Sequence, residues 1–352
     1  MASRVIGVDI GTTHIRAAEV EISGKPGSSP TGTVHSFAMA PVPTGVVADG
    51  EVMDIQAVAS TLKQMWSRAS FSHKQVVVGL GNSRTVVREM EVPAMPMQQL
   101  RTSLPFQVAE VLPMHTDEAL LDFYPTSHRI EDGRELLRGI MVGAAKSAVA
   151  NTILAIETAG LRPVGVDLNA FALQRAQANA EWNSQVIALV DIGARVTTVV
   201  IVAQGQPRLV RMLPAGGQDT TDAIASAMQI SMPEAEQFKR TVGVGNEGPP
   251  EQQLARDASI QSTRQLVEGI RNTFVYFAGN NAGQAVQHAV LTGGGAYLPG
   301  LGQYLASASR LPVSFGSGLA NVRVAKKAQG PLAGQETLVA TVIGLALAEV
   351  RS

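Results

Sequence analysis

The sequence contains no cysteine, almost no net charge and no long hydrophobic run. Because cysteine is absent from all 352 residues, disulfides and thiolate metal sites are excluded, and the composition is compatible with a reducing compartment. The formal net charge of −1 provides no broad attraction to nucleic acid or anionic lipid. The remaining composition, 45% hydrophobic and 16% charged, is that of an ordinary globular protein. A chain of this length exceeds what one core usually supports, so two lobes are expected.

No segment has the length of a membrane span. The longest late apolar stretch, residues 338–348, has 11 residues and includes Thr341 and Gly344, whereas a bilayer core of about 30 Å requires a helix of about 20 residues. The chain starts directly with a strand pattern, without the basic and apolar regions of a secretory signal. We therefore expect a cytosolic protein that reaches a membrane only through a partner.

One short motif occurs twice, about half a chain apart. Asp9-Ile10-Gly11-Thr12-Thr13 and Asp191-Ile192-Gly193-Ala194-Arg195 each follow an apolar run and precede a second β-type run. A glycine in a tight turn lets backbone N–H groups approach phosphate oxygens, and the hydroxyls of Thr12 and Thr13 add donors. A single copy would be best explained as an ordinary hairpin. Two copies in the same context predict that two half-molecules grip one polyphosphate.

The aspartates of this repeated motif are the candidate metal ligands. Asp9 and Asp191 stand at strand ends, where a carboxylate can hold Mg²⁺ through water. Asp191 is also a candidate for orienting an attacking water. Arg195 stands where a small or hydroxyl residue is typical, and two roles stay open for it: pointing outward, or adding a charge to the phosphates.

Three glycines form a further candidate ligand segment. Gly293, Gly294 and Gly295 follow a predicted strand at residues 290–292, and a helix is expected to begin near Leu301. This context favours close backbone approach to a nucleoside and its α-phosphate over a flexible turn. Tyr297, just beyond the glycines, joins the candidate set.

Glu236 and Lys239 are three residues apart on one face of a predicted helix, close enough to contact one ribose. On spacing alone, a surface ion pair explains them better. The chain has no Walker-type phosphate loop, no nucleophile signature and no metal-ligand spacing among its six histidines.

The hydrophobic spacing predicts helices at residues 55–68, 168–181 and 336–349. Between residues 93 and 145 it predicts a small inserted α+β module. This module contains a helix at residues 98–112, which Pro105 should kink or split, and a hairpin around Asp132-Gly133.

Taken together, the motifs resemble those of the actin-like ATPase superfamily. Its two phosphate motifs match residues 9–13 and 191–195, and its adenosine motif matches residues 291–301. The resemblance implies an α/β fold with two duplicated ribonuclease-H-like lobes and Mg²⁺ with ATP bound between them. His14 and Arg195 depart from the commonest pattern, which bears on hydrolysis more than on binding.

The superfamily resemblance also assigns roles outside the phosphate turns. Residues 235–241 resemble its ribose-contacting helix, which promotes Glu236 and Lys239 to nucleotide ligands. Gly216 and Gly217 open the subdomain that leads to this helix and belong to the same site. Asp167, in the connecting element, stands where the family often has a catalytic acidic or amide residue.

Within the superfamily, the chain resembles the PilM family of type IV pilus assembly proteins, which are related to the division protein FtsA. The resemblance extends over nearly the whole chain and includes residues 47–54, 104–113 and 121–124, and the inserted module specifies this branch. It implies a scaffold at the cytoplasmic face of the inner membrane. Its partner would be the N-terminal segment of a PilN-like membrane protein, bound in a groove near the module. It also implies slow hydrolysis at most and admits self-association.

The expected division of the chain follows from the same resemblance. The first lobe core comprises residues 1–92 with 146–175 and 335–352, and residues 93–145 form the inserted subdomain. The second lobe core comprises residues 176–218 and 286–334, and its upper subdomain comprises residues 219–285.

Two other functions within the superfamily stay open as alternatives. A small-molecule kinase would need a substrate base and a sugar pocket, for which the sequence offers no candidate. An FtsA-like division protein would end in a linker and an amphipathic membrane helix, whereas here the predicted closing helix runs directly to Arg351 and Ser352.

Overall fold

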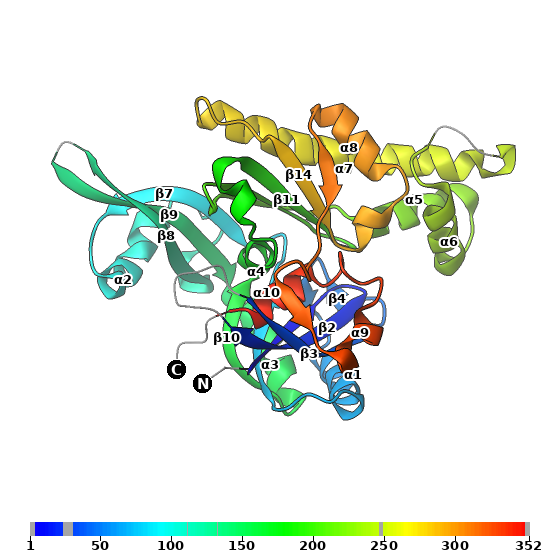
Figure 1. Cartoon of the computed structure of the whole chain (residues 1–352), viewed down its shortest axis with the longest axis horizontal. Helices are drawn as coiled ribbons and strands as arrows, with labels where there is room; N and C mark the ends of the chain where they lie inside the picture. The colour runs from blue at the N-terminus through cyan, green and yellow to red at the C-terminus, as the bar shows by residue number, and fades with distance from the viewer. Residues whose placement is uncertain (1–3, 24–30, 111, 132, 246–248, 349–352) are drawn as a thin grey trace.

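Two mixed β-sheets, one in each lobe, form the framework of the molecule (Figure 1). The computed structural model describes residues 4–23, 31–110, 112–131, 133–245 and 249–348. The first sheet has, in spatial order, β10 (Arg162–Leu168), β6 (Gln75–Leu80), β1 (Arg4–Ile10), β2 (His14–Ser23), β3 (Thr31–Pro41) and β16 (Val322–Val324). The second has β13 (Gln206–Leu213), β12 (Thr197–Ala203), β11 (Val186–Ile192), β14 (His288–Thr292) and β15 (Val313–Phe315).

The two sheets repeat one pairing scheme. β1 pairs antiparallel with β2 and parallel with β6, and β2 pairs antiparallel with β3. β11 pairs antiparallel with β12 and parallel with β14, and β12 pairs antiparallel with β13. The predicted duplication is therefore present in the topology, and it places Asp9 and Asp191 at equivalent strand ends.

Two short helices, α4 (Asn169–Ala176) and α10 (Ala340–Ala346), pack against each other in the layer between the sheets (Figure 1). Every residue of α10 is buried, as expected for a helix that is apolar on all sides. α10 also contacts β1 and β2, and α4 contacts β12 of the other lobe. The helices therefore join the two lobe cores.

Both of these helices are shorter than the sequence predicts. α4 ends at Ala176 because the carbonyls of Ala176 and Ala178 accept hydrogen bonds from the Asn321 amide at 3.1 and 2.6 Å. A 3-10 turn, η2 (Ala180–Ser184), follows. Before α10, the carbonyls of Glu336 and Thr337 accept N–H groups of other segments at 2.8 and 3.0 Å, so the helix cannot begin there; residue 349 lies outside the described residues. The spacing of apolar residues in the sequence does not reveal these tertiary hydrogen bonds.

The outer faces of the sheets are covered by longer helices. α1 (Ile55–Arg68) and α3 (Lys146–Thr158) pack together beneath the first sheet, whereas the short helix α9 (Lys326–Leu332) packs in one hydrophobic cluster with α10 on the opposite face of that sheet. α7 (Gln253–Asn280) and α8 (Leu301–Ser309) cover the second sheet. α5 (Gly217–Met228) and α6 (Met232–Val242) pack on α7 at the far end of that lobe, and the turn η3 (Pro250–Gln252) precedes α7.

The inserted module is a three-stranded sheet, ordered β7 (Val86–Pro93), β9 (Arg134–Ala145) and β8 (Ala119–Glu131), packed on α2 (Met97–Val108). The predicted hairpin is confirmed, because β8 and β9 pair through Glu131 opposite Arg134; Asp132 lies outside the described residues. Pro105 does not split α2, which continues to Val108. A short turn, η1 (Thr116–Glu118), precedes β8.

The expected division of the chain into lobes and subdomains stays a prediction, and the positions of β7 and β16 in the sheets are relevant to it. β7 belongs to the sheet of the inserted module, and β16 joins the first sheet, although the sequence places residues 286–334 in the second lobe. A small ribbon of β4 (Val47–Ala48) and β5 (Glu51–Val52) precedes α1. Within the part of the chain that the structure describes, no helix has the length and apolarity needed to cross a membrane.

Candidate functional site

Two turns of the same construction face the interior layer from the two lobes. In the first, the Gly11 N–H donates to the His14 carbonyl at 3.0 Å, and in the second the Gly193 N–H donates to the Val196 carbonyl at 3.0 Å. Each turn links two antiparallel strands at the end where its aspartate stands. The predicted repetition of the turn is thus a repetition of geometry.

The structure brings the two aspartates into electrostatic contact. Burial raises the pKa of Asp191 above its ordinary value, hydrogen bonding from Thr292 acts against this, and the charge of Asp9 raises it further. Burial likewise raises the pKa of Asp9, against the effect of Arg16. Two buried carboxylates with raised pKa values, one of which raises the pKa of the other, form a place where a cation is strongly favoured.

Asp191 is held in position by residues of both lobes. The Thr292 hydroxyl, at the end of β14, donates to Oδ1 at 2.8 Å. The Thr341 hydroxyl, on α10, lies 3.5 Å from Oδ2. The carboxylate orientation is therefore tied to the helix that joins the lobe cores.

Arg16 is a residue of this site that sequence analysis missed. It stands directly opposite Asp9 in the β1–β2 pair, with its Nη1 3.5 Å from Asp9 Oδ2, and only 15% of its side chain is exposed. Its Nε is buried and has no hydrogen-bond partner among the described residues. A guanidinium with unused donors beside the first turn is suited to an anion. The hairpin register, countable from the turn, would have identified it.

The connecting element contributes Asn169 to the site, two residues beyond the predicted Asp167. Hydrogen bonding from the Asn169 side chain acts to lower the pKa of Asp9, although burial outweighs it. Its buried Oδ1 has no hydrogen-bond partner among the described residues. Asp167 forms an ion pair with Arg175 and accepts the Leu168 N–H at 2.8 Å. A catalytic role for Asp167 stays a prediction, while the amide beside Asp9 belongs to Asn169.

The structure resolves which way Arg195 points. Its guanidinium binds the carboxylates of Asp219 and Asp222, on the first turns of α5, at 2.6 Å each. Burial lowers the pKa of Arg195, but the hydrogen bonds that it donates to Asp222 and Asp219 outweigh burial and raise the pKa. Asp219 also accepts the Gly216 N–H at 2.7 Å. Arg195 therefore fastens the second turn to α5.

Replacing Arg195 by alanine is expected to weaken ATP binding by up to roughly fivefold, the upper range for a partly exposed ion pair. The change frees the second turn and leaves Asp219 and Asp222 unpaired beside the turn at which nucleotide phosphates are expected. Calorimetric titration measures the change. Adding Asp222→Asn should restore part of the affinity, and an affinity unchanged in Arg195→Ala would contradict the fastening role.

Gly216 and Gly217 lie directly on the second turn. The Gly217 N–H donates to the Gly193 carbonyl at 2.9 Å. A side chain at Gly216 would place its Cβ 2.5 Å from the carbonyl oxygens of Gly193 and Ala194, so only glycine fits there. Both glycines thus contact the turn backbone and bring it close to the start of α5, and their place in the nucleotide site stays a prediction.

Lys239 and Glu236 form the ion pair that their spacing predicts, at 2.6 Å, but the pair is not a free surface feature. Lys239 donates to the Gly217 carbonyl at 3.0 Å and is 13% exposed. Burial raises the pKa of Glu236, but hydrogen bonds from Lys239, Thr221 and Arg240 outweigh it and lower the pKa. The pair anchors α6 to the glycines at the second turn.

The triple-glycine segment closes the same region. Gly294, Gly295 and Tyr297 belong to a 3-10 turn, η4 (Gly294–Tyr297), which follows β14. A Cβ added to Gly217 would lie 3.3 Å from the Cα of Gly295, so the two segments are in close contact. The ring of Tyr297 is 48% exposed and stacks on Phe315, with ring centroids 6.1 Å apart. On the first lobe, burial and the charges of Arg16 and Arg240 lower the pKa of His14.

Asp191→Asn is expected to stabilise the ligand-free protein at neutral pH. A carboxyl with a raised pKa binds its proton more tightly in the folded state than in the unfolded chain. The stability that this bound proton contributes is therefore lost as pH rises from the ordinary pKa of 3.8 through the raised pKa of Asp191. Thermal melts in a metal chelator should show a higher Tm than wild type at pH 7. The difference should shrink as pH falls to about 4, and an equal or lower Tm at pH 7 would contradict the raised pKa.

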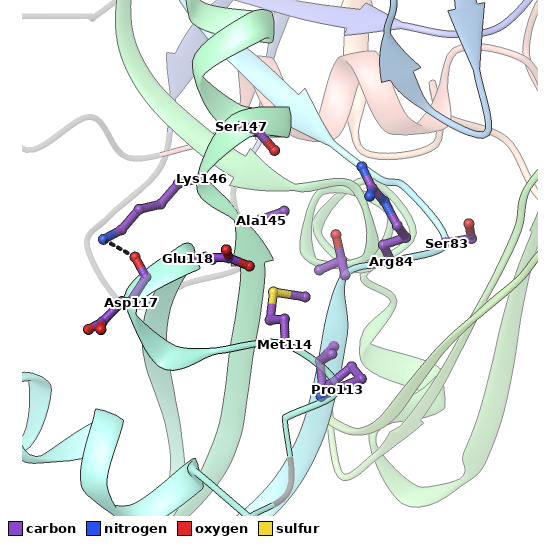
Figure 2. Close-up of a pocket in the computed structure, with 11 residues that line it drawn as sticks. Ser83, Arg84, Pro113, Met114, Asp117, Glu118, Ala145, Lys146 and Ser147 are labelled. Atoms are coloured by element: carbon purple, nitrogen blue, oxygen red, sulfur yellow. Dashed lines mark hydrogen bonds between the residues drawn. The ribbon is translucent and has the colours of Figure 1, made fainter.

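A separate cavity of about 700 Å³ lies at the base of the inserted module (Figure 2). Its walls come from residues 83–86, residues 113, 114, 117 and 118, and residues 145–147. Pro113 and Met114 line one side, while the Lys146 ammonium group binds the Asp117 carbonyl at 2.7 Å on another. Within the described residues, no group of three or more histidine, aspartate or glutamate side chains is placed to hold a metal. Asp9 and Asp191 stay the predicted metal ligands.

The sequence profile of the family described as type IV pilus assembly protein PilM matches residues 7–350. Cell division protein FtsA from Bacillus subtilis (strain 168) is 21% identical over 263 residues, which cover 68% of this chain and 58% of FtsA. The chain thus matches less than two thirds of the length of that relative.

Two solved structures extend the comparison. A PilM-PilN type IV pilus biogenesis complex is similar with a TM-score of 0.85 and 27% identity, covering 100% of each chain. MreB 5 of Spiroplasma citri bound to AMPPNP is similar with a TM-score of 0.52 and 14% identity, covering 98% of this chain and 95% of MreB 5. These matches confirm the predicted two-lobed actin-like fold.

Proposed function

The chain belongs to the PilM family of type IV pilus assembly proteins, and from this membership we propose that it is an ATP-binding scaffold of a pilus assembly platform. The nucleotide would lie between the lobes, with its phosphates at the turns of Gly11 and Gly193. A PilN-like membrane protein would hold the scaffold at the cytoplasmic face of the inner membrane. The observation that carries the proposal is the pair of facing aspartate turns.

The residues around the turns fit a magnesium nucleotide. Asp9 and Asp191 are carboxylates with raised pKa values, and a divalent cation between them would offset their repulsion. The unused Nε of Arg16 supplies a donor for a phosphate oxygen. Fold relatives include MreB 5 bound to AMPPNP, which supports the same ligand class.

Different residues of the chain would bind different parts of the nucleotide. Backbone N–H groups of the two turns and the hydroxyls of Thr12 and Thr13 bind phosphate oxygens. The glycines at 293–295 allow the nucleoside to lie against the backbone, and the anchored Lys239 and Glu236 flank the ribose. When bound, Mg²⁺ would supply positive charge between the carboxylates and the phosphates.

A ligand held by both lobes stabilises the lobe arrangement in which it makes both sets of contacts. The two turns belong to different sheets and are connected through α4 and α10. We therefore assign the nucleotide a mainly conformational role with slow hydrolysis at most. Binding in this place does not require a fast chemical step.

The partner segment would occupy the cavity at the base of the inserted module. The cavity lies beside the subdomain that distinguishes this branch of the superfamily, and a related PilM has been solved in complex with PilN. Its apolar side at Pro113 and Met114 suits a hydrophobic side chain of a peptide, and Asp117 and Glu118 provide a polar rim (Figure 2).

Calorimetry with ATP and MgCl₂, and separately with a peptide of the N-terminal cytoplasmic residues of the PilN-like protein from the same genome, tests both parts. The expected result is one site for each ligand. The absence of ATP binding would refute the nucleotide part, and the absence of peptide binding would refute the partner part. Rapid phosphorylation of a small molecule would instead favour a kinase.

A further inference from the structure

One short segment, residues 79–86, which runs from the end of β6 to the first residue of β7, borders both the aspartate site and the cavity. Its first residues lie against Asn169, and its last four residues line the cavity wall. The two sites are therefore separated along the chain by only a few residues. The contacts of this segment determine whether a change at one site is felt at the other.

On the aspartate side, the Asn169 side chain lies directly on the backbone of the segment. A Cβ at Gly79 would be 2.1 Å from Asn169 Oδ1, and a Cβ at Gly81 would be 2.6 Å from its Nδ2. This close approach requires glycine at both positions. There is no free space at this contact. The segment must therefore move with the Asn169 amide when the amide shifts toward or away from Asp9.

On the opposite side, the segment is confined by the β4–β5 ribbon. Gly50, with a φ of +83°, lies so close that a Cβ there would be 2.4 Å from the Gly81 carbonyl oxygen and 2.9 Å from Asn82 Cα. Glu51 of β5 accepts a hydrogen bond from Arg84 Nε at 2.6 Å. The segment is thus held between Asn169 and the ribbon.

Asn82 connects the confined part of the segment to the cavity wall. It is 2% exposed, and its Oδ1 accepts the Arg84 N–H at 3.1 Å and the Thr85 hydroxyl at 3.0 Å. Arg84 and Thr85 both line the cavity. Displacement of Asn82 therefore moves two residues of the wall.

We propose that residues 79–86 link the nucleotide site to the partner cavity, so that Mg-ATP at the aspartates and the PilN-like peptide in the cavity bind cooperatively. This inference rests on the proposed function. A nucleotide that fixes Asn169 also fixes the segment and the cavity wall, so the peptide no longer has to order them. By thermodynamic linkage, the peptide must tighten nucleotide binding by the same factor.

The test measures the affinity of the full-length protein for the fluorescent PilN-like N-terminal peptide, with and without saturating AMPPNP and MgCl₂. For the wild type, the nucleotide should tighten peptide binding by at least roughly fivefold, the lower end for coupled sites. Asn82→Ala should reduce this ratio to below roughly twofold, because it removes the hydrogen bonds that connect Arg84 and Thr85 to the confined part of the segment, while Asn82 itself is neither a proposed nucleotide ligand nor a cavity-lining residue. Affinity for AMPPNP without peptide should stay at the wild-type value.

Gly81→Ala serves as a second variant, since its Cβ displaces the Asn169 amide, and it should also reduce the ratio. Gly302→Ala on α8 is the matched control, because a Cβ there meets no atom within 4 Å; it should keep the wild-type ratio. Thermal melts identify any variant that does not fold. Equal peptide affinities with and without nucleotide in the wild type, or an unchanged ratio in both variants, would overturn the linkage. Failure of the wild type to bind either ligand would refute the proposed function itself.

Discussion

Replacing Asp9 and Asp191 together by alanine is expected to abolish Mg-ATP binding while leaving the protein folded. Two magnesium contacts through ordered water are charge-assisted and contribute on the order of 1.5–3 kcal/mol each, so affinity should fall by more than roughly 100-fold. Folding should survive, because burial and mutual repulsion raise the pKa of Asp191, which shows that its charged form is unfavourable in the ligand-free protein. Calorimetry measures the affinity, and thermal melts confirm the fold.

The matched control for the double variant is Asp122→Ala. Asp122 is an exposed aspartate of the inserted module that pairs with Arg101 at 3.0 Å, far from the turns in the fold. It should bind Mg-ATP like the wild type. Normal binding by a folded double variant would show that the nucleotide site has been assigned to the wrong residues.

Met114→Glu is expected to abolish binding of the PilN-like peptide without changing ATP affinity. Met114 lines the apolar side of the cavity, and a carboxylate there would be buried by the peptide and repelled by nearby Glu118 (Figure 2). Loss of a central contact costs at least about 2 kcal/mol, or roughly 30-fold in affinity. Fluorescence anisotropy with labelled peptide measures the effect.

Phe106→Glu is the matched control for this prediction. It introduces the same charge on α2 of the same module, at a side chain that is 85% exposed and does not line the cavity. It should leave peptide affinity unchanged. If Phe106→Glu abolished binding and Met114→Glu did not, the partner would dock on α2 instead.

Much of the fold could be predicted from local sequence. The predicted helix at residues 55–68 is found as α1, because its apolar spacing is regular and the Asp54 side chain caps it by accepting the Ala57 N–H at 3.0 Å. The closing helix was predicted too long. The carbonyls of Glu336 and Thr337 bond to residues far away in the chain, and no local pattern reveals such bonds.

The site shows the same division between local and tertiary information. The repeated aspartate turns were visible because strand, aspartate and glycine are contiguous in sequence. Counting residues from the turn along the two strands places Arg16 opposite Asp9. The contact of Asn169 with Asp9, in contrast, depends on how α4 lies under β6. The ion pairs of Arg195 join a turn to a helix more than twenty residues away, so its sequence position left both of its roles open.

The cavity could only be located approximately from sequence. Its walls come from three segments that converge at the base of the module, and only the folded chain brings them together. The resemblance predicted a groove near residues 93–145 without naming its lining. The residues 79–86 that border it were not singled out, because their significance lies in contacts with Asn169 and the β4–β5 ribbon.

A crystal structure of the full chain with AMPPNP and Mg²⁺ would test the central claim most directly. The account predicts one nucleotide between the lobes, with its phosphates at the backbone of Gly11 and Gly193 and the metal-bound waters on Asp9 and Asp191. Nucleotide bound at another place, while the two turns carry none, would contradict it.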